Sequence, residues 1–268
     1  MPGRPFPSSG SPFSRDFLDR WSRRGPLREF LDYYAIRDVC LGPAGHGPDD
    51  FFGDAINLDL YAVANGGGAS VASYAIEVAR EGKIRATTGT GNGDTTTCTI
   101  VTPEQYLGDA NCMCEVRHSP VTAVTETRIE VGFSDDIPDS DKSHVNVLAT
   151  PSVNATVVDA ALDTYDHTSS TTTNQLTTIG TSIDAVKTTF TPAVAVVAAT
   201  YMLTRIMCFT NFVVLWRDGV LVAKHGGDDG TAAVEGGSLM AWTALIRASN
   251  ATSKSHDIDY VLTAQNRS

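Results

Sequence analysis

Apolar and polar residues alternate in short runs from Phe51 onward, and the runs end at Gly, Asn, Asp or Pro. An alternation with a period of two is typical of β-strands that turn one face toward a core. In TRIEVGF, from Thr127 to Phe133, the apolar residues alternate with Arg128 and Glu130. This segment predicts a strand with one buried face and one solvated face.

Similar runs predict about a dozen strands, with no long amphipathic helix between them. This number favours a two-sheet antiparallel jelly-roll sandwich over a parallel α/β layout. Asp218 and Gly219 stand in the expected turn of a hairpin that runs from Phe212 to Lys224. The expected strands cover residues 58–64, 73–79, 83–88, 95–101, 112–117, 127–133, 145–149, 157–164, 199–208, 212–216, 220–224, 238–248 and 257–262.

Residues 1–50 differ from this all-β domain, which we place at residues 51–268. The first 48 residues carry seven Arg, five Asp or Glu and no Lys, whereas the rest of the chain is acidic. Arg is suited to forked contacts with carboxylates, so we interpret residues 1–50 as an anchoring arm that is mostly irregular, has short helices and ends in a Gly/Pro linker. Its docking partner is either this chain's own domain or a neighbouring subunit. The expected anchoring residues are Arg15, Phe17, Leu18, Trp21, Arg23, Arg24 and Phe30.

Composition and charge exclude several classes of partner. The formal net charge is -11, so a general affinity for nucleic acid is not expected. The most apolar run, Pro192 to Ala199, is far shorter than the roughly 20 residues that cross a bilayer, and no secretory signal is recognisable. Five cysteines without a CxxC pair predict reduced thiols, and Cys112 and Cys114 are expected to be small buried residues on one strand face.

Two acidic segments offer candidate metal ligands, Asp139 and Asp141 in one and Asp228 and Asp229 in the other. Hard cations such as calcium take several oxygen ligands, which carboxylates supply. The first segment lacks the Gly and Glu that an EF-hand loop requires, and connecting loops are the favoured interpretation of both. We therefore expect no bound metal and no cofactor.

Glu126, Arg128 and Glu130 are expected to share one strand face, superficially like the glutamate-bearing strand of laminarinase-type enzymes. Arg128 stands where that pattern has Asp, and residues four apart on a strand lie about 13 Å apart. Retaining glycosidases need carboxyl groups about 5 Å apart and inverting ones about 6.5 to 9.5 Å. The sequence therefore predicts a solvated Glu-Arg-Glu ladder and a protein that is not an enzyme.

Several segments together resemble concanavalin A-like jelly-roll domains of tailed-bacteriophage virion proteins, over residues 58–268. They are RIEVGFSD, the DTYD segment at Asp163 to Asp166, a strand with Arg205, the FVVLWRDGVLV hairpin and the terminal DIDYV followed by Arg267. The resemblance implies a β-sandwich displayed on a phage particle.

We therefore expect a structural virion protein that is made in the host cytoplasm, docks through its arm and acts as capsid decoration, head fibre or tail component. Its partners would be other virion proteins and further copies of itself in a homo-oligomer. The alternative is a lectin-like module that binds host-surface glycans, with or without calcium. A polysaccharide-cleaving enzyme is the third hypothesis.

Overall fold

The computed structural model describes residues 39–41, 56, 60–65, 73–77, 82–90, 96–136, 145–147, 152–153, 157–167, 172–180, 186–189, 195–226, 234 and 237–266. These residues form strands and the turns between them. The described part of the chain contains no helix that is long and apolar enough to span a membrane. The predicted anchoring residues and the four aspartates proposed as metal ligands lie outside the described residues.

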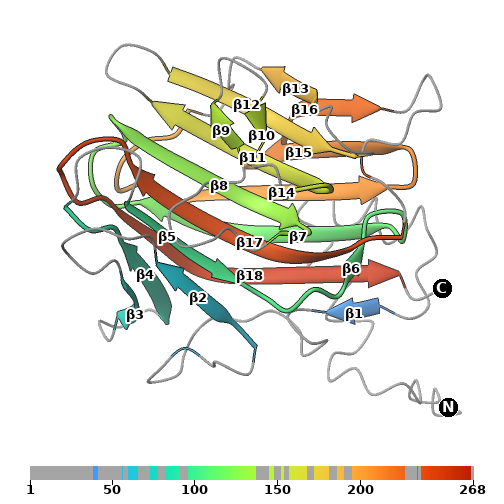
Figure 1. Cartoon of the computed structure of the whole chain (residues 1–268), viewed down its shortest axis with the longest axis horizontal. Helices are drawn as coiled ribbons and strands as arrows, with labels where there is room; N and C mark the ends of the chain where they lie inside the picture. Colours follow the sequence, from blue (N-terminus) through green and yellow to red (C-terminus); the bar gives the residue numbers. More distant parts are fainter. Residues whose placement is uncertain are drawn as a thin grey trace, which may run out of the picture.

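Two antiparallel sheets stack face to face (Figure 1). We name them the β8 sheet and the β7 sheet after their central strands. The β8 sheet has the order β13(Val186–Thr189), β12(Thr172–Ile179), β11(Ala160–His167), β8(Thr127–Ser134), β17(Leu239–Ala248), β5(Thr96–Val101), β2(Ala62–Asn65), and β6(Tyr106–Leu107) pairs with β17. The β7 sheet has the order β16(Val220–Gly226), β15(Phe212–Arg217), β14(Met202–Phe209), β7(Cys112–Pro120), β18(Ser255–Asn266), β4(Lys83–Thr87), β3(Ser73–Glu77), and β1(Val39–Leu41) pairs with β18. A separate pair joins β9(Val145–Val147) and β10(Ser152–Val153).

This architecture confirms the predicted all-β sandwich of two antiparallel sheets. Each segment that the alternation marked as a strand overlaps one. The alternation predicted none of the short strands β1, β6, β10 and β13, and it also missed β12, which pairs with β11 over its whole length. Its sequence, TTNQLTTI, has only Leu176 and Ile179 as apolar residues, so no alternation of apolar and polar residues marks it. The hydroxyl and amide groups of β12 instead serve polar contacts on both faces of the sheet.

The core lies between the sheets because alternate residues of each strand point inward. Ile129, Val131 and Phe133 of β8 are buried there, as the pattern predicted, and Trp242 of β17 is fully buried in a T-shaped ring contact with Tyr61. Burying side chains of this size stabilises a fold by about 1.5 to 3 kcal/mol each. Cys112 and Cys114 of β7 belong to the same core, in agreement with their predicted role.

The hairpin between β15 and β16 also forms where the sequence placed it. Asp218 and Gly219 both have positive φ, 48° and 81°, which is the backbone of a tight two-residue turn. The Asp218 side chain accepts a 2.8 Å hydrogen bond from the backbone N–H of Leu203. The turn is thereby fastened to the start of β14, and it places Arg217 at the end of β15.

Candidate functional site

Charged residues of three neighbouring strands meet on the outer side of the β8 sheet. Arg128 of β8 lies in register with Asp166 of β11 on one side and with Arg247 of β17 on the other. All three alternate with core residues, so they point away from the β7 sheet. We name this cross-strand set the arginine row.

The next two rows of the same face carry mostly hydroxyl, amide and carboxyl groups. Glu130 of β8 lies in register with Thr164 of β11, and Gly132 lies in register with Thr243 of β17. Together with the arginine row they form what we call the polar face. Its polar members are Thr97, Thr99, Arg128, Glu130, Thr164, Asp166, Gln175, Thr177, Thr243 and Arg247, all of which are buried.

Because this face is buried, a polar group on it that lacks a hydrogen bond destabilises the fold. Arg128 Nη2 donates a 2.8 Å hydrogen bond to Asp166 Oδ2, and this ion pair is more than nine-tenths buried. Asp166 Oδ1 and Thr243 Oγ1 are also buried, and neither has a hydrogen-bond partner in the described part of the chain. An unsatisfied buried acceptor costs on the order of 1 to 3 kcal/mol. A ligand rich in hydroxyl groups would supply the missing donors.

The structure corrects the predicted solvated Glu-Arg-Glu ladder. Glu126 precedes β8 in a turn with a φ of 53°, and its carboxylate binds the side-chain amide of Asn250. Only Arg128 and Glu130 share the strand face, with exposed fractions of 7% and 0%, so neither is solvated. The error has a simple physical origin, since alternation shows that residues leave the core but not whether the outer face is covered.

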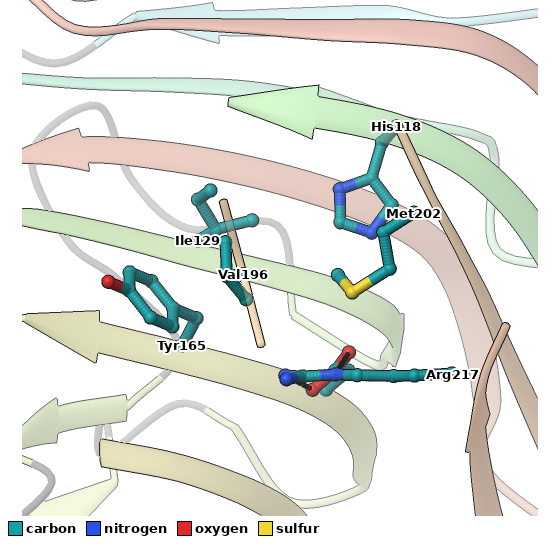
Figure 2. A pocket seen from close by; sticks show the side chains of 7 residues that line it. His118, Ile129, Tyr165, Val196, Met202 and Arg217 are labelled. Carbon is teal, nitrogen blue, oxygen red and sulfur yellow. Dashed lines mark hydrogen bonds and ion pairs between the residues drawn. The ribbon is translucent and has the colours of Figure 1, made fainter. Parts of the chain in front are cut away.

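A second polar cluster lies between the two sheets, and we name it the interior network. Arg217 of β15 reaches across the core to Asp163 of β11, to whose two oxygens it donates hydrogen bonds of 2.9 and 2.5 Å. Arg217 also donates to Asn174 Oδ1 at 2.7 Å, and Thr204 donates to Asp163 at 3.2 Å. Figure 2 shows Arg217 beneath His118 and Met202 in a pocket between the sheets. Its lining residues are buried and come from both sheets.

Two histidines extend the interior network into the β7 sheet. His118 Nε2 lies 3.0 Å from Thr204 Oγ1, and His118 Nδ1 lies 2.8 Å from His256 Nε2. Because Thr204 donates its proton to Asp163, it accepts from His118 Nε2, and His118 Nδ1 then accepts from His256. Burial, and next Arg217, lower the pKa of His118 to about 3, and burial lowers the pKa of His256 as well. Both rings are therefore neutral at ordinary pH.

The outer side of the β7 sheet also buries a charged pair. Glu115 of β7 binds Arg205 of β14 and accepts a 2.6 Å hydrogen bond from the hydroxyl of Tyr260. Burial, followed by the charge of Glu115, raises the pKa of Tyr260. Both oxygens of Glu115 thus accept a hydrogen bond, whereas Asp166 Oδ1 remains able to accept one from a ligand.

Part of the polar face is recognisable in the sequence. Arg128 and Glu130 came from the alternation in β8, and Asp166 stood in the DTYD segment without a role. Arg247 and Thr243 were missed, because nothing local to β17 shows that it lies beside β8. Among the described residues, no group of three or more His, Cys, Asp or Glu could hold a metal ion.

No protein-family profile and no curated protein sequence matches the chain. Solved structures do match its fold. The carbohydrate recognition domain of Emp47p is 11% identical, with a TM-score of 0.54 over 82% of this chain and 94% of its own. The catalytic domain of an endo-1,3-beta-glucanase (laminarinase) from Thermotoga petrophila RKU-1 is 11% identical, with a TM-score of 0.54 over 86% of this chain and 99% of its own. A protein of unknown function from Shewanella oneidensis MR-1 is 12% identical, with the same TM-score over 99% of this chain and 96% of its own.

These neighbours overturn the prediction that the chain is not an enzyme. A further laminarinase and a glycoside hydrolase family protein share the fold, so the failure of one carboxylate pair on β8 did not justify excluding an enzyme. None of these structures is that of a known phage virion protein, so that half of the resemblance gains no support. The other half is confirmed: the chain has a concanavalin A-like jelly-roll fold.

Proposed function

We propose that the protein binds a carbohydrate across the polar face of the β8 sheet. The observation that carries the proposal is the buried set of charged and hydroxyl side chains on three adjacent strands, in which Asp166 Oδ1 and Thr243 Oγ1 lack partners in the described part of the chain. Sugar hydroxyls both donate and accept hydrogen bonds. They can therefore donate to the carboxylate oxygen and either donate to or accept from the threonine hydroxyl. The neighbours support the choice of ligand class, since one is a carbohydrate recognition domain and others are glycoside hydrolases.

The polar face favours recognition through hydrogen bonds over ring stacking. Its polar members are carboxylates, guanidinium groups, amides and hydroxyls. The aromatic side chains that the sequence offered as stacking platforms lie elsewhere: Trp242 is in the core, and Tyr260 binds Glu115 on the β7 sheet. Binding sites built from buried hydrogen-bonding groups discriminate strongly against ligands that lack the matching polar group.

A glycan array probed with the full chain tests the proposal. We expect reproducible binding to one class of glycan, and we expect Asp166→Asn and Thr243→Val each to weaken it about tenfold, because the first replaces a charged carboxylate with a neutral amide and the second removes a hydroxyl group. Asp259→Asn is the matched control, since Asp259 binds Arg117 in the other sheet. Binding that survives both substitutions on the polar face would place the glycan elsewhere. An array without any reproducible signal would contradict the proposal.

Glycan cleavage is a second candidate function, favoured by a carboxylate pair that crosses two strands. Glu130 and Asp166 lie in adjacent rows of β8 and β11, so their backbone positions are diagonal neighbours about 7 to 8 Å apart. Side chains that extend from two such positions can hold their carboxyl groups about 6.5 to 9.5 Å apart, the spacing that inverting glycosidases use. Release of reducing ends from a bound polysaccharide, abolished by Glu130→Gln, would establish this activity. Binding without release would leave the binding function alone.

The virion location is a prediction from the sequence that we retain as a proposal compatible with glycan binding on a host surface. Peptide mass spectrometry of purified particles tests it directly. Deletion of residues 1–38 is the sharper experiment, because Val39–Leu41 pairs with β18 and belongs to the β7 sheet. We expect this shortened chain to fold and to be absent from particles. Its incorporation at the level of the full chain would refute the anchoring role.

A further inference from the structure

Two cysteines of neighbouring strands lie opposite each other in the core. Met207 of β14 pairs with Met113 of β7, so the next position on the antiparallel strand β14, Cys208, lies opposite the preceding position on β7, Cys112. Both are free thiols with an exposed fraction of 0%, and both belong to the same core cluster. The thiol of Cys208 also forms a hydrogen bond with that of Cys112. The strand register and the contact between the thiols therefore agree.

The backbone spacing of this pair suits a disulfide. Residues directly opposite each other on antiparallel strands have Cα atoms about 4.5 to 5.5 Å apart. Disulfides in proteins join residues whose Cα atoms lie about 4.4 to 6.8 Å apart. Cys114, the third thiol in this part of the core, lies opposite Ile206 instead. The register therefore favours Cys112 as the partner of Cys208.

The three thiols do not have the arrangement of a metal site. Structural zinc sites hold the ion with four Cys or His ligands at the corners of a tetrahedron. Among the residues that the structure describes, no group of three or more His, Cys, Asp or Glu is placed to hold a metal ion. A bond between two of the cysteines is the chemistry that their positions favour.

We propose that Cys112 and Cys208 form a disulfide that joins β7 to β14 when the chain folds in an oxidising environment. Spacing along the sequence does not indicate this pair, because about 100 residues separate the two cysteines. The intervening chain supplies β8, β11 and β12 to the other sheet. The bond would close this long loop and restrict the unfolded chain, which stabilises the fold. This proposal does not depend on the carbohydrate ligand.

The oxidant in this reaction is a small-molecule disulfide such as oxidised glutathione. One protein thiolate attacks a sulfur of that disulfide and releases one small thiol, and the second protein thiolate then attacks the mixed disulfide and releases the other. The two protons that the cysteines lose balance the two that the released thiolates take up. The hydrogen bond with Cys112, and next burial, raise the pKa of Cys208, so the closed core keeps it as an unreactive thiol. We therefore expect the disulfide to form while the core is still open to solvent.

Refolding of the denatured full chain in a buffer of oxidised and reduced glutathione tests the proposal. The remaining thiols are then alkylated in denaturant, and the digested chain is analysed by mass spectrometry. We expect one pair of peptides linked through Cys112 and Cys208. The oxidised chain should also unfold roughly 10 °C above the same chain refolded in a reductant, because the bond closes a long loop.

Cys208→Ala should abolish both the linked peptides and the difference between the two unfolding temperatures. Cys114→Ala, on the same face of β7 as Cys112, is the matched control and should keep both. Near-UV circular dichroism shows whether each variant has folded, and the linked peptides of the unaltered chain keep the test decisive if a variant does not fold. Alkylation of both Cys112 and Cys208 in the unaltered chain, or linkage of either to another cysteine, would overturn the proposal.

Discussion

Asp163 and Asp166 lie three residues apart on β11 and point to opposite faces of the same sheet, each toward an arginine. Asp163 faces inward, where Arg217 binds both of its oxygens and Thr204 adds a third hydrogen bond. Asp166 faces outward, where Arg128 binds Oδ2, and Oδ1 has no partner in the described part of the chain. The comparison separates two uses of buried charge: a saturated cluster joins the sheets, and an incompletely bonded one is suited to a ligand.

The largest expected difference between the two pairs is in stability. Arg217→Met leaves Asp163 charged in the core, and breaking a buried pair from one side costs about 3 to 5 kcal/mol. Denaturant unfolding should show this loss as a lower midpoint. The double variant Asp163→Asn with Arg217→Met should be more stable than Arg217→Met alone, because no uncompensated charge remains. A loss below about 1 kcal/mol in the single variant would contradict the role of the interior network.

The interior network also makes stability depend on pH. His118 and His256 have folded pKa values below the unfolded value of 6.5, so the unfolded chain binds more protons once the pH falls below 6.5. The contribution of the neutral rings is complete above pH 6.5 and is lost progressively as the pH falls toward the folded pKa of about 3 for His118. The slope is about 1.4 kcal/mol per pH unit for each histidine.

Unfolding midpoints measured between pH 6.5 and 4.5 check this dependence. Aspartates and glutamates titrate mostly below this window, so histidines dominate it. Replacing His118 with Gln should reduce the slope by about one histidine's share. A slope that is unchanged by this substitution would show that the interior rings do not titrate as we expect.

The smallest expected effect on stability comes from the outer pair. Asp166→Asn keeps an acceptor for Arg128 but removes the charge that faces this buried guanidinium, so we expect a loss of about 1 to 3 kcal/mol. The corresponding substitution in the interior network, Asp163→Asn, should cost more, since both Asp163 oxygens bind Arg217 and one of them also accepts from Thr204. Denaturant curves of both variants under the same conditions make the comparison. A larger loss for Asp166→Asn would show that the outer pair is a structural element.

Local patterns in the sequence predicted most of the fold and only part of the candidate site. The alternation in β8 identified Arg128 and Glu130 as outward-facing, because the period of a strand is a local property. The alternation could not identify β12, whose outer and inner faces are both largely polar. Nor could it pair Asp163 with Arg217, 54 residues later, or Arg128 with Arg247, since these contacts depend on the order of strands in space.

Strand β18 lies in the middle of its sheet, between β4 and β7, and also pairs with β1. Until residues 255–266 have been synthesised, the β7 sheet lacks the strand that lies between β7 and β4. Both of these strands then present unpaired edges. Each half is then open to pairing with another polypeptide. Production of this protein should therefore be unusually sensitive to premature termination shortly before residue 255, where the shortened product would aggregate instead of folding into a smaller sandwich.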